Sequence, residues 1–292
     1  MQRRTFVKNS AAIGAYIGLG SLASSIMSCN TLGNNHSFKI KDFGIQLYSI
    51  KEDMLKSPFE VLVKLAEYGY KTLESFESDL GIYWGMSNMD FKREVENVGM
   101  KLIASHVDIN VNFEAKVDEA AKAGLQHLIC PSIDGGNTLD YYRAFADKFN
   151  ECGEICQKAG IRFGYHNHGY SFKPIDGIYP QDILMENTDA KLVDFEIDLY
   201  WVLTAGEDPI RWLQKYPNRF THCHLKDREN LPLDQEDASI DLGKGILNIP
   251  EVLKVAENNG LKHIIIEQER YPIAEPLEAT RANSNYLRGI LG

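Results

Sequence analysis

The stretch that decides the fold is RFTHCHLKD, residues 219–227, where apolar and polar side chains alternate before the chain turns polar. Such alternation predicts a half-buried β-strand. The strand closes with His224, Lys226 and Asp227. Imidazole, ammonium and carboxylate groups thus gather at one strand end, which is where a barrel enzyme carries its chemistry.

Two other short runs end in a carboxylate. Residues 192–198 (LVDFEID) deliver Asp198, and residues 263–267 (HIIIE) deliver Glu267. Together with His224 they offer one imidazole and two carboxylates, a set that suits a divalent cation such as Mn, Co, Zn or Mg. The fold that brings strand ends from across a chain to one rim is the parallel α/β barrel.

Apolar runs alternate with helical patterns about every 30 residues from residue 43 onward, which is typical of βα units. Start and stop signals flank the helices, such as Ser57-Pro58 before the first and Gly69 after it. We therefore predict a single (β/α)8 TIM barrel over residues 42–292. Its strands are expected at 43–48, 71–75, 101–106, 126–131, 161–165, 192–198, 219–227 and 263–267.

Composition narrows the class of partner. The chain has 292 residues, 44% of them hydrophobic, which is enough for one large core. Its formal net charge is −10, and no basic stripe is present beyond the N-terminus. An acidic protein of this kind is not expected to bind nucleic acid.

The N-terminus is predicted to be an export signal. Residues 1–28 combine a basic start, with paired Arg3 and Arg4 typical of the twin-arginine route, and a run of small and apolar residues. The run ends in IMSC, which resembles a lipobox with Cys29 as the lipidated residue, and residues 29–41 then form a tether. We expect a periplasmic or membrane-anchored lipoprotein, with lipidation of Cys29 left open. A retained membrane anchor is less favoured because the run is short and rich in Gly and Ser.

The last polar residues of the predicted strands are the site candidates, because active sites of α/β barrels lie at the C-terminal ends of the strands. Converging carboxylates repel one another unless a cation or a proton neutralises them, so the set predicts a metal site. Its members are Glu74, His106, His166, His168, Asp198, His224, Lys226, Glu267 and Glu269.

Several segments together resemble one family, the xylose-isomerase-like TIM barrels known as sugar phosphate isomerases/epimerases. The resemblance runs from about residue 42 to the C-terminus and is specific in order and spacing. The segments are YHNH (165–168), DLYW (198–201), AGEDP (205–209), HLKD (224–227) and IEQ (266–268).

The resemblance implies a divalent metal held by strands five to eight, here by His166 or His168 together with Asp198, His224 and Glu267. In ketose 3-epimerases of the family, strands five and eight each supply a glutamate that moves the proton beside the carbonyl. This chain has His166 in the place of the first glutamate. Its His-rich strand five is more similar to that of inosose dehydratases, and to barrels that open 3-keto-sugars by β-elimination.

The expected roles follow. The metal ligands are His166, Asp198, His224 and Glu267, and His168 is a base or an alternative ligand. Glu267, His106 and Lys226 are also catalytic candidates. Of these, His106 and Lys226 would orient substrate hydroxyls or stabilise oxyanion charge. The candidates for substrate contact are Glu74, Trp84 and Trp201, where the two indoles would stack on a sugar ring or simply pack.

The leading function is a divalent-metal-dependent sugar isomerase or epimerase that removes a proton next to a sugar carbonyl. Because sugar phosphates are cytoplasmic and the chain carries an export signal, the substrate is expected to be unphosphorylated. One alternative is a metal-dependent lyase acting on a keto-sugar or 3-keto-glycoside, and another is a non-catalytic sugar-binding lipoprotein. The sequence leaves the sugar, the metal and the oligomeric state open.

Overall fold

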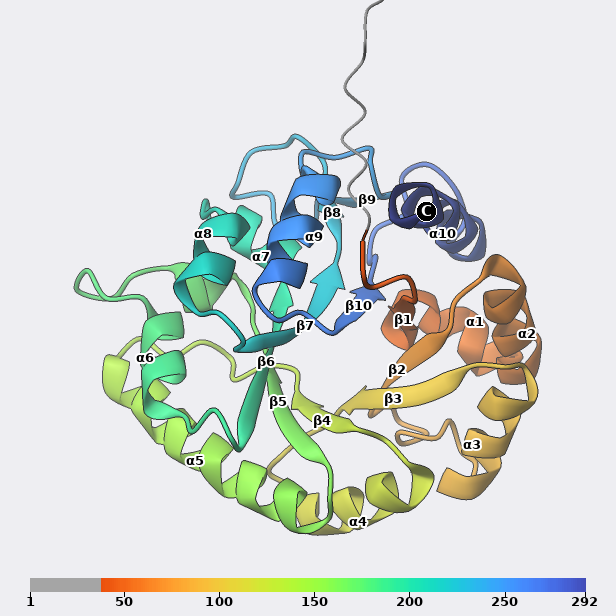
Figure 1. Cartoon of the computed structure of the whole chain (residues 1–292), viewed down its shortest axis with the longest axis horizontal. Coiled ribbons are helices and arrows are strands. Elements are labelled where there is room, and N and C mark those ends of the chain that lie inside the picture. The colour runs from red at the N-terminus through yellow and green to blue at the C-terminus, as the bar shows by residue number, and fades with distance from the viewer. Residues whose placement is uncertain (1–37) are drawn as a thin grey trace, which may run out of the picture. The chain divides into compact units, whose positions relative to one another are not determined.

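Eight parallel strands close into a barrel in the computed structural model, which describes residues 38–292 (Figure 1). Around the barrel the order is β1-β10-β7-β6-β5-β4-β3-β2, so neighbours in sequence are neighbours in space. The predicted TIM barrel is confirmed. The strands are β1 (Gly44–Gln46), β2 (Thr72–Phe76), β3 (Lys101–His106), β4 (His127–Cys130), β5 (Arg162–His166), β6 (Val193–Asp198), β7 (Phe220–Leu225) and β10 (His263–Ile266).

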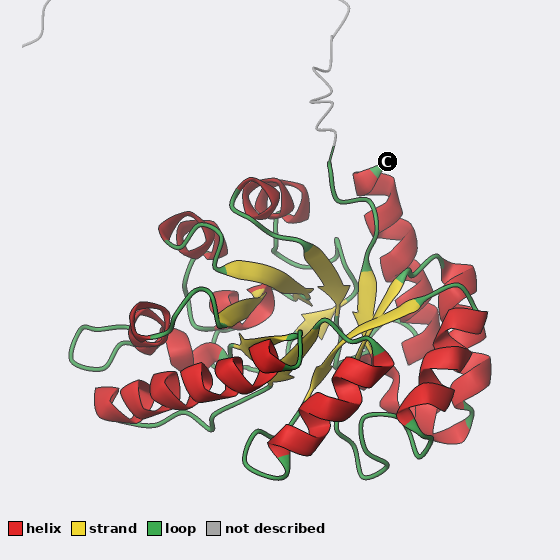
Figure 2. Cartoon of the chain, turned by 60° about the horizontal axis from the view of Figure 1, so that its bottom comes forward, coloured by secondary structure: helices red, strands yellow, loops and turns green. Residues whose placement is uncertain are grey.

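Helices cover the outside of the barrel (Figure 2). Proline in the first turn starts several of them, since its fixed φ suits a helix and its missing N–H costs nothing there. They are α1 (Lys51–Lys56), α2 (Pro58–Tyr68), α3 (Asn88–Asn97), α4 (Phe113–Ala123), α5 (Leu139–Lys158), α6 (Pro180–Asn187), α7 (Leu199–Thr204), α8 (Pro209–Lys215), α9 (Ile249–Asn258) and α10 (Pro276–Leu291), with 3-10 helices η1 (Leu47–Ile50) and η2 (Gly169–Phe172).

The predicted export signal and Cys29 lie outside the described residues, as does most of the tether. Within residues 38–292, none of the helices has the length and apolar character needed to span a bilayer.

The stretch at 219–227 is not one continuous strand. The barrel strand β7 ends at Leu225, and a short strand β8 (Asp227–Arg228) pairs antiparallel with β9 (Ser239–Ile240). The chain folds back because the buried Asp227 carboxylate accepts hydrogen bonds from the backbone N–H groups of Gly243 and Gly245. The long loop after β7 is thereby held as a hairpin.

The interior of the barrel is largely polar, whereas the main apolar core lies between the strands and the helices. A separate apolar cluster joins residues of β3, β4 and β10, which do not all neighbour one another and therefore meet inside the barrel. This cluster consists of Ile103, Ala104, Ile129 and Ile265.

A basal polar layer lies among inward-facing residues near the strand starts. His127 and His222 pack with ring centroids 4.2 Å apart, and His222 stacks on His263 at 4.5 Å. The Asp194 carboxylate contacts His127 Nε2 at 3.0 Å and accepts a hydrogen bond from Arg162 Nε at 2.5 Å. Ionisable groups thus close the interior below the site.

Candidate metal centre

Four buried side chains converge at the C-terminal ends of adjacent strands. His166 ends β5, Asp198 ends β6, His224 lies in β7, and Glu267 follows β10. One donor atom from each lies within 4.8 Å of all the others. His166 Nε2 is 3.3 Å from Asp198 Oδ2, and His224 Nδ1 is 3.2 Å from Glu267 Oε2 and 4.0 Å from Asp198 Oδ2. We call these four residues the metal cluster.

The spacing of the metal cluster fits a divalent cation. Bonds of about 2.1 Å in tetrahedral geometry place donor atoms roughly 3.4 Å apart, and the observed separations of 3.2, 3.3 and 4.0 Å bracket that value. Two imidazoles and two carboxylates form a mixed nitrogen and oxygen set that suits Zn, Mn or Co. The fold brings the four sequence-predicted ligands together, next to a second group of possible ligands that shares His224 and consists of Glu74, His106, Glu196 and His224.

Both imidazoles are held with one nitrogen facing the cluster. His166 Nδ1 lies 3.1 Å from the carbonyl oxygen of Pro131, to which it donates, leaving Nε2 for the cluster. His224 Nε2 donates to Glu74 Oε1 at 2.7 Å, leaving Nδ1 for the cluster. A carboxylate or carbonyl behind a ligand histidine fixes its tautomer and orientation.

A second polar group lies directly beneath the metal cluster. His106 Nε2 contacts Glu196 Oε2 at 2.9 Å and Glu74 Oε1 at 3.2 Å, and His224 Nε2 contacts Glu196 Oε2 at 3.3 Å. Sequence reasoning missed Glu196, although a signal was present. Asp194, Glu196 and Asp198 alternate along β6 and therefore share its inner face.

Charges in these two layers are strongly coupled. Burial opposes ionisation of Glu74, yet His106 and His224 hold its pKa well below the usual range. Burial and the charge of Glu74 raise the pKa of Glu196. Burial also opposes protonation of His106, but the two glutamates outweigh it and raise the pKa of His106 to about 9. His106 is therefore a cation at neutral pH.

Lys226 lies next to the metal cluster and contacts the carboxylates of Glu267 and Glu269. It is 1% exposed, its Nζ lies 3.6 Å from Glu267 Oε2, and it also donates to Glu269. Burial opposes the charge of Lys226, but these carboxylates raise its pKa. In turn, His224 and Lys226 lower the pKa of Glu267 against the effect of burial. The carboxylate is thereby kept ionised for a cation.

His168 is a neutral imidazole beside the metal cluster. Its ring stacks on that of Tyr170, with ring centroids 5.7 Å apart, and lies tilted beside that of Trp201, with ring centroids 5.1 Å apart. Burial, reinforced by His166, lowers the pKa of His168 to about 3. Its Nδ1 has no hydrogen-bond partner among the described residues.

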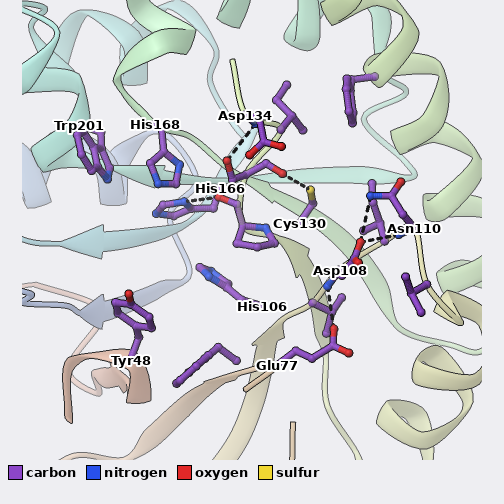
Figure 3. Close-up of a pocket in the computed structure, with 18 of the residues that line it drawn as sticks. Tyr48, Glu77, His106, Asp108, Asn110, Cys130, Asp134, His166, His168 and Trp201 are labelled. Atoms are coloured by element: carbon purple, nitrogen blue, oxygen red, sulfur yellow. Dashed lines mark hydrogen bonds between the residues drawn. The ribbon is translucent and has the colours of Figure 1, made fainter. Parts of the chain in front are cut away.

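A cavity of about 770 Å³ opens directly onto the metal cluster. Figure 3 shows Trp201 and His168 at one end, His166 and His106 between, and Asp108 and Asn110 at the other end. Glu267 and Glu269 also line the cavity. The candidate base, the cationic His106 and two residues of the cluster therefore face one space.

Two predicted substrate contacts need correction. Glu74 is fully buried and bonded to His224, so it supports a ligand from behind rather than lining the cavity. Trp84 is 4% exposed, donates from its indole nitrogen to Ser75 Oγ and packs edge-on against Phe76, so it is a packing residue. Trp201 does line the cavity.

Comparisons with known proteins point to one family. An inosose dehydratase from Clostridium perfringens is 25% identical over 293 residues, which cover 93% of this chain and 96% of that protein. A crystal structure of a sugar phosphate isomerase/epimerase from Parabacteroides distasonis superposes with a TM-score of 0.74 at 28% identity, covering 88% of this chain and 97% of that one. The IolI protein, solved with a bound zinc atom, shares the fold with a TM-score of 0.70 at 12% identity, over 86% of this chain and 98% of that one. The model of the xylose isomerase-like TIM barrel family matches residues 62–290, and the chain belongs to that family.

Proposed function

We propose that the protein is a divalent-metal-dependent lyase. In this reaction, the proton next to the carbonyl of an unphosphorylated keto-sugar is removed, and the oxygen on the β-carbon then leaves. The family makes the chain a sugar-processing enzyme of the xylose isomerase-like kind. The observation that carries the finer proposal is the histidine pair His166 and His168 at the end of β5, where residues 162–170 contain no carboxylate.

This composition favours elimination over epimerisation. A symmetric epimerase needs two comparable bases, one on each side of the carbon that exchanges its proton. Here the base opposite Glu267 would be an imidazole rather than a second carboxylate. Glu267 is also bonded to His224 and Lys226. Elimination needs one base and one proton donor, and His168 and His106 line the same cavity.

The proton and electron balance is simple. His168 takes the proton from the carbon beside the carbonyl, and the electron pair of that C–H bond forms the new C=C bond. The bond from the β-carbon to oxygen breaks. The departing oxygen receives a proton from His106 and leaves as water or an alcohol. A cation bound by the metal cluster supplies Lewis acidity that makes the C–H group more acidic.

Two kinds of relative support different outcomes. Inosose dehydratases, by their name, remove water from a keto-polyol, and they align over nearly the whole chain. A sugar isomerase or epimerase is the second candidate, favoured by the name of the Parabacteroides distasonis structures, at 28% and 27% identity. Both reactions begin with the same proton removal.

An exchange experiment in deuterated water separates the candidates. The protein, loaded with Mn, Co, Zn or Mg, is incubated with ketoses, keto-polyols and 3-keto-glycosides, each beside its phosphorylated counterpart where one exists. The lyase proposal expects an unsaturated product together with released water or alcohol. Deuterium incorporated beside the carbonyl with no bond cleavage would instead support the isomerase or epimerase.

Metal removal tests whether the protein is a catalyst or a sugar-binding protein. Chelation is expected to abolish turnover and lower thermal stability, because a ligand at about 100 times its Kd stabilises by about 2.7 kcal/mol. Sugar binding that is unchanged by chelator, in protein without a stoichiometric cation, would favour the sugar-binding lipoprotein instead.

We also propose that the protein is exported, because residues 1–28 combine the paired Arg3 and Arg4 with a run of small and apolar residues. An unphosphorylated substrate would follow from that location. Cell fractionation of the full-length chain, with and without Arg3→Lys and Arg4→Lys, tests this. Recovery of the wild-type protein solely in the cytoplasm, uncleaved, would contradict it and reopen sugar phosphates as substrates.

A further inference from the structure

Exposed lysines lie where the strands of the barrel begin. Because all eight strands are parallel, their first residues share one face of the barrel, opposite the cavity. One of these lysines precedes β1, and the others lie at the starts of β2, β3, β6 and β10. They are Lys39, Lys71, Lys101, Lys191 and Lys262, and we call them the basal lysines. They are far apart in the sequence, and only the fold gathers them on one face.

The basal lysines have no acidic partners among residues 38–292. An ion pair joins Lys116 to Glu77 at 2.7 Å near the cavity, for example, but none involves a basal lysine. In the stretches that lead into the eight strands, the exposed acidic side chains are Asp42 and Asp189. The positive charges of the basal lysines are therefore left largely uncompensated.

The opposite face of the barrel is acidic. Exposed carboxylates lie in the loops that follow the strands, and they belong to Glu77, Asp79, Asp108, Asp134, Asp234, Glu236, Asp237 and Glu269. The last turns of the helices carry both signs, with Glu67, Glu96, Glu186, Lys122, Lys158 and Arg288 exposed there. The barrel is thus basic where its strands begin and acidic where they end, although the chain has a net charge of −10.

The chain enters the barrel at the face of the basal lysines. Phe38 is buried, and the backbone N–H of Ile40 donates to Glu257 Oε1, near the end of α9, at 2.8 Å. The loop after α9 leads to Lys262 and β10. Because Cys29 lies nine positions before Phe38, the chain between them spans at most about 30 Å. A lipid on Cys29 would therefore bring the basal lysines nearer to a membrane than the cavity.

We propose that the basal lysines form a docking surface for the anionic phosphodiester head groups of a membrane. The assignment rests on the proposed export for the identity of that membrane, and it goes beyond the proposed reaction. Lysines near an anionic bilayer attract it jointly, and the attraction falls off within a Debye length, about 8–10 Å at moderate salt. In this orientation the cavity opens away from the bilayer, toward soluble sugars, and the acidic face is kept from the head groups.

Vesicle sedimentation with charge-reversed variants tests the docking surface. The full-length chain is mixed with vesicles of phosphatidylcholine alone or of phosphatidylcholine with phosphatidylglycerol. One variant reverses three basal lysines, and they are Lys71→Glu, Lys101→Glu and Lys191→Glu. The matched control reverses three exposed lysines that follow strands β1, β5 and β7, and they are Lys56→Glu, Lys173→Glu and Lys244→Glu. Both variants have the same net charge and keep residues 1–28, so any binding through the N-terminus is common to them.

The basal variant is expected to bind the anionic vesicles at least about tenfold more weakly than the wild type, whereas the control loses at most about threefold. Binding to vesicles of phosphatidylcholine alone should be the same for all three proteins. The preference of the wild type for anionic vesicles should also disappear as salt rises. Since all six positions are exposed, the fold should be kept, and circular dichroism verifies this. Equal losses in the two variants would show that net charge alone matters and would overturn the docking surface.

Lysine acetylation by a water-soluble reagent, followed by mass spectrometry, tests the orientation. On anionic vesicles the basal lysines are expected to lose reactivity relative to the protein in solution. Lys56, Lys173 and Lys244 are expected to react as they do in solution. Protection of these three lysines in place of the basal ones would overturn the proposed orientation.

The docking surface and the export proposal fail separately. An exported protein whose basal variant binds anionic vesicles like the wild type would retain export and refute docking. Binding that depends on the basal lysines, in a protein recovered solely in the cytoplasm, would retain the docking surface and refute export. Tighter binding of duplex DNA than of anionic vesicles would overturn the assignment to lipid.

Discussion

Glu74 controls the metal cluster without touching the cavity. Its Oε1 accepts from His224 Nε2 at 2.7 Å and from Gln46 Nε2 at 2.8 Å. The bond to His224 places the lone pair of Nδ1 toward the cluster and raises the basicity of the ring. Glu74 of β2 thereby makes His224 of β7 a better ligand for a cation.

We predict that Glu74→Gln weakens cation affinity about 10- to 100-fold, the usual effect of losing a carboxylate behind a ligand histidine. Competition with a chromophoric chelator measures the affinity. The control is Glu60→Gln, the same chemical change at an exposed position of α2. Unchanged affinity in Glu74→Gln would show that His224 is oriented by other contacts.

Replacing His166, at the end of β5, and His168, just after it, should have different effects. His166→Ala is expected to remove stoichiometric metal, because His166 Nε2 is one of the four converging donors. His168→Ala is expected to retain the metal and to lower turnover by about 100-fold or more, as for loss of a general base. Metal content per chain and kcat separate the two effects, and the reverse pattern would exchange their roles.

Residue types at strand ends were predictable because barrel enzymes carry their site at one rim. His166, Asp198, His224 and Glu267 follow from that rule and from the family resemblance, and the fold brings them together. Glu196 did not follow, since the rule inspects only the last polar residue of each strand. Whether Trp84 or Trp201 faces the cavity depends on the backbone that follows the strand, a loop for Trp84 and helix α7 for Trp201, which sequence spacing does not specify.

The hairpin after β7 shows how an element is fixed by one side chain. Asp227 is fully buried, and its carboxylate accepts from four backbone N–H groups, those of Arg228, Gly243, Gly245 and Leu247. A carboxylate that replaces four water contacts with four backbone donors holds the loop closed. Lys226, one residue earlier, can then face Glu267.

Gly245→Ala is predicted to destabilise the protein by about 1–3 kcal/mol, the usual cost of an unaccommodated methyl group. A Cβ at Gly245 would lie 2.3 Å from the Arg228 carbonyl oxygen and 2.3 Å from Asp227 Oδ1. Urea unfolding midpoints report the change. Gly289→Ala is the control, since a Cβ there meets nothing within 4 Å and alanine favours helix α10 by up to about 1 kcal/mol. Equal midpoints for the two variants would refute the close packing under the hairpin.

Element boundaries were predicted well where capping chemistry is local. Pro58 and Gly69 bound α2, as the start and stop signals in the sequence predicted. The short helix α7 and the strand pair β8–β9 were not foreseen. The strand pair depends on contacts between residues far apart in the chain, such as Asp227 accepting from Gly245 N, which no periodicity encodes. Helix α7 begins at a local cap, where Asp198 Oδ1 accepts from Trp201 N, and Asp198 was predicted from the sequence only as a metal ligand.

At the scale of the whole molecule, the basal polar layer ties three strands together. Asp194 of β6 is bonded to His127 of β4 and to Arg162 of β5. Barrel interiors are usually packed with branched apolar side chains. The sequence spacing of His127, His222 and His263 does not predict that these three side chains meet. Their contact follows only from the relative register of the strands.

Acid should weaken the barrel through Asp194. Burial opposes its ionisation, but His127 and Arg162 lower the pKa of Asp194 to about 2. Against an unfolded value near 3.9, this contributes roughly 2–3 kcal/mol above pH 4, which is lost as pH falls from about 4 to about 2. Because the pKa of Asp194 is lower in the native state than in the unfolded state, the protein loses stability as the pH falls.

The Asp194→Asn variant checks this sign. At pH 7 it should unfold at lower urea concentration than the wild type, and the difference should shrink as pH falls through 4 toward 2. The control is Asp140→Asn on the surface of α5, whose side chain is 92% exposed. A difference that stays constant with pH would show that Asp194 acts by shape rather than by charge.

The order of strands around the barrel divides the labour of the chain between its two halves. The four converging donors come from β5, β6, β7 and β10, all after residue 161, whereas the loops after β3 and β4 and part of α5 supply much of the cavity wall. The first half of the chain also contributes Glu74, His106 and the Pro131 carbonyl, which contact the donors or their partners. Grafting the first half of a relative onto the second half of this chain would therefore alter the cavity wall and keep the donor set, provided that the graft retains these three groups.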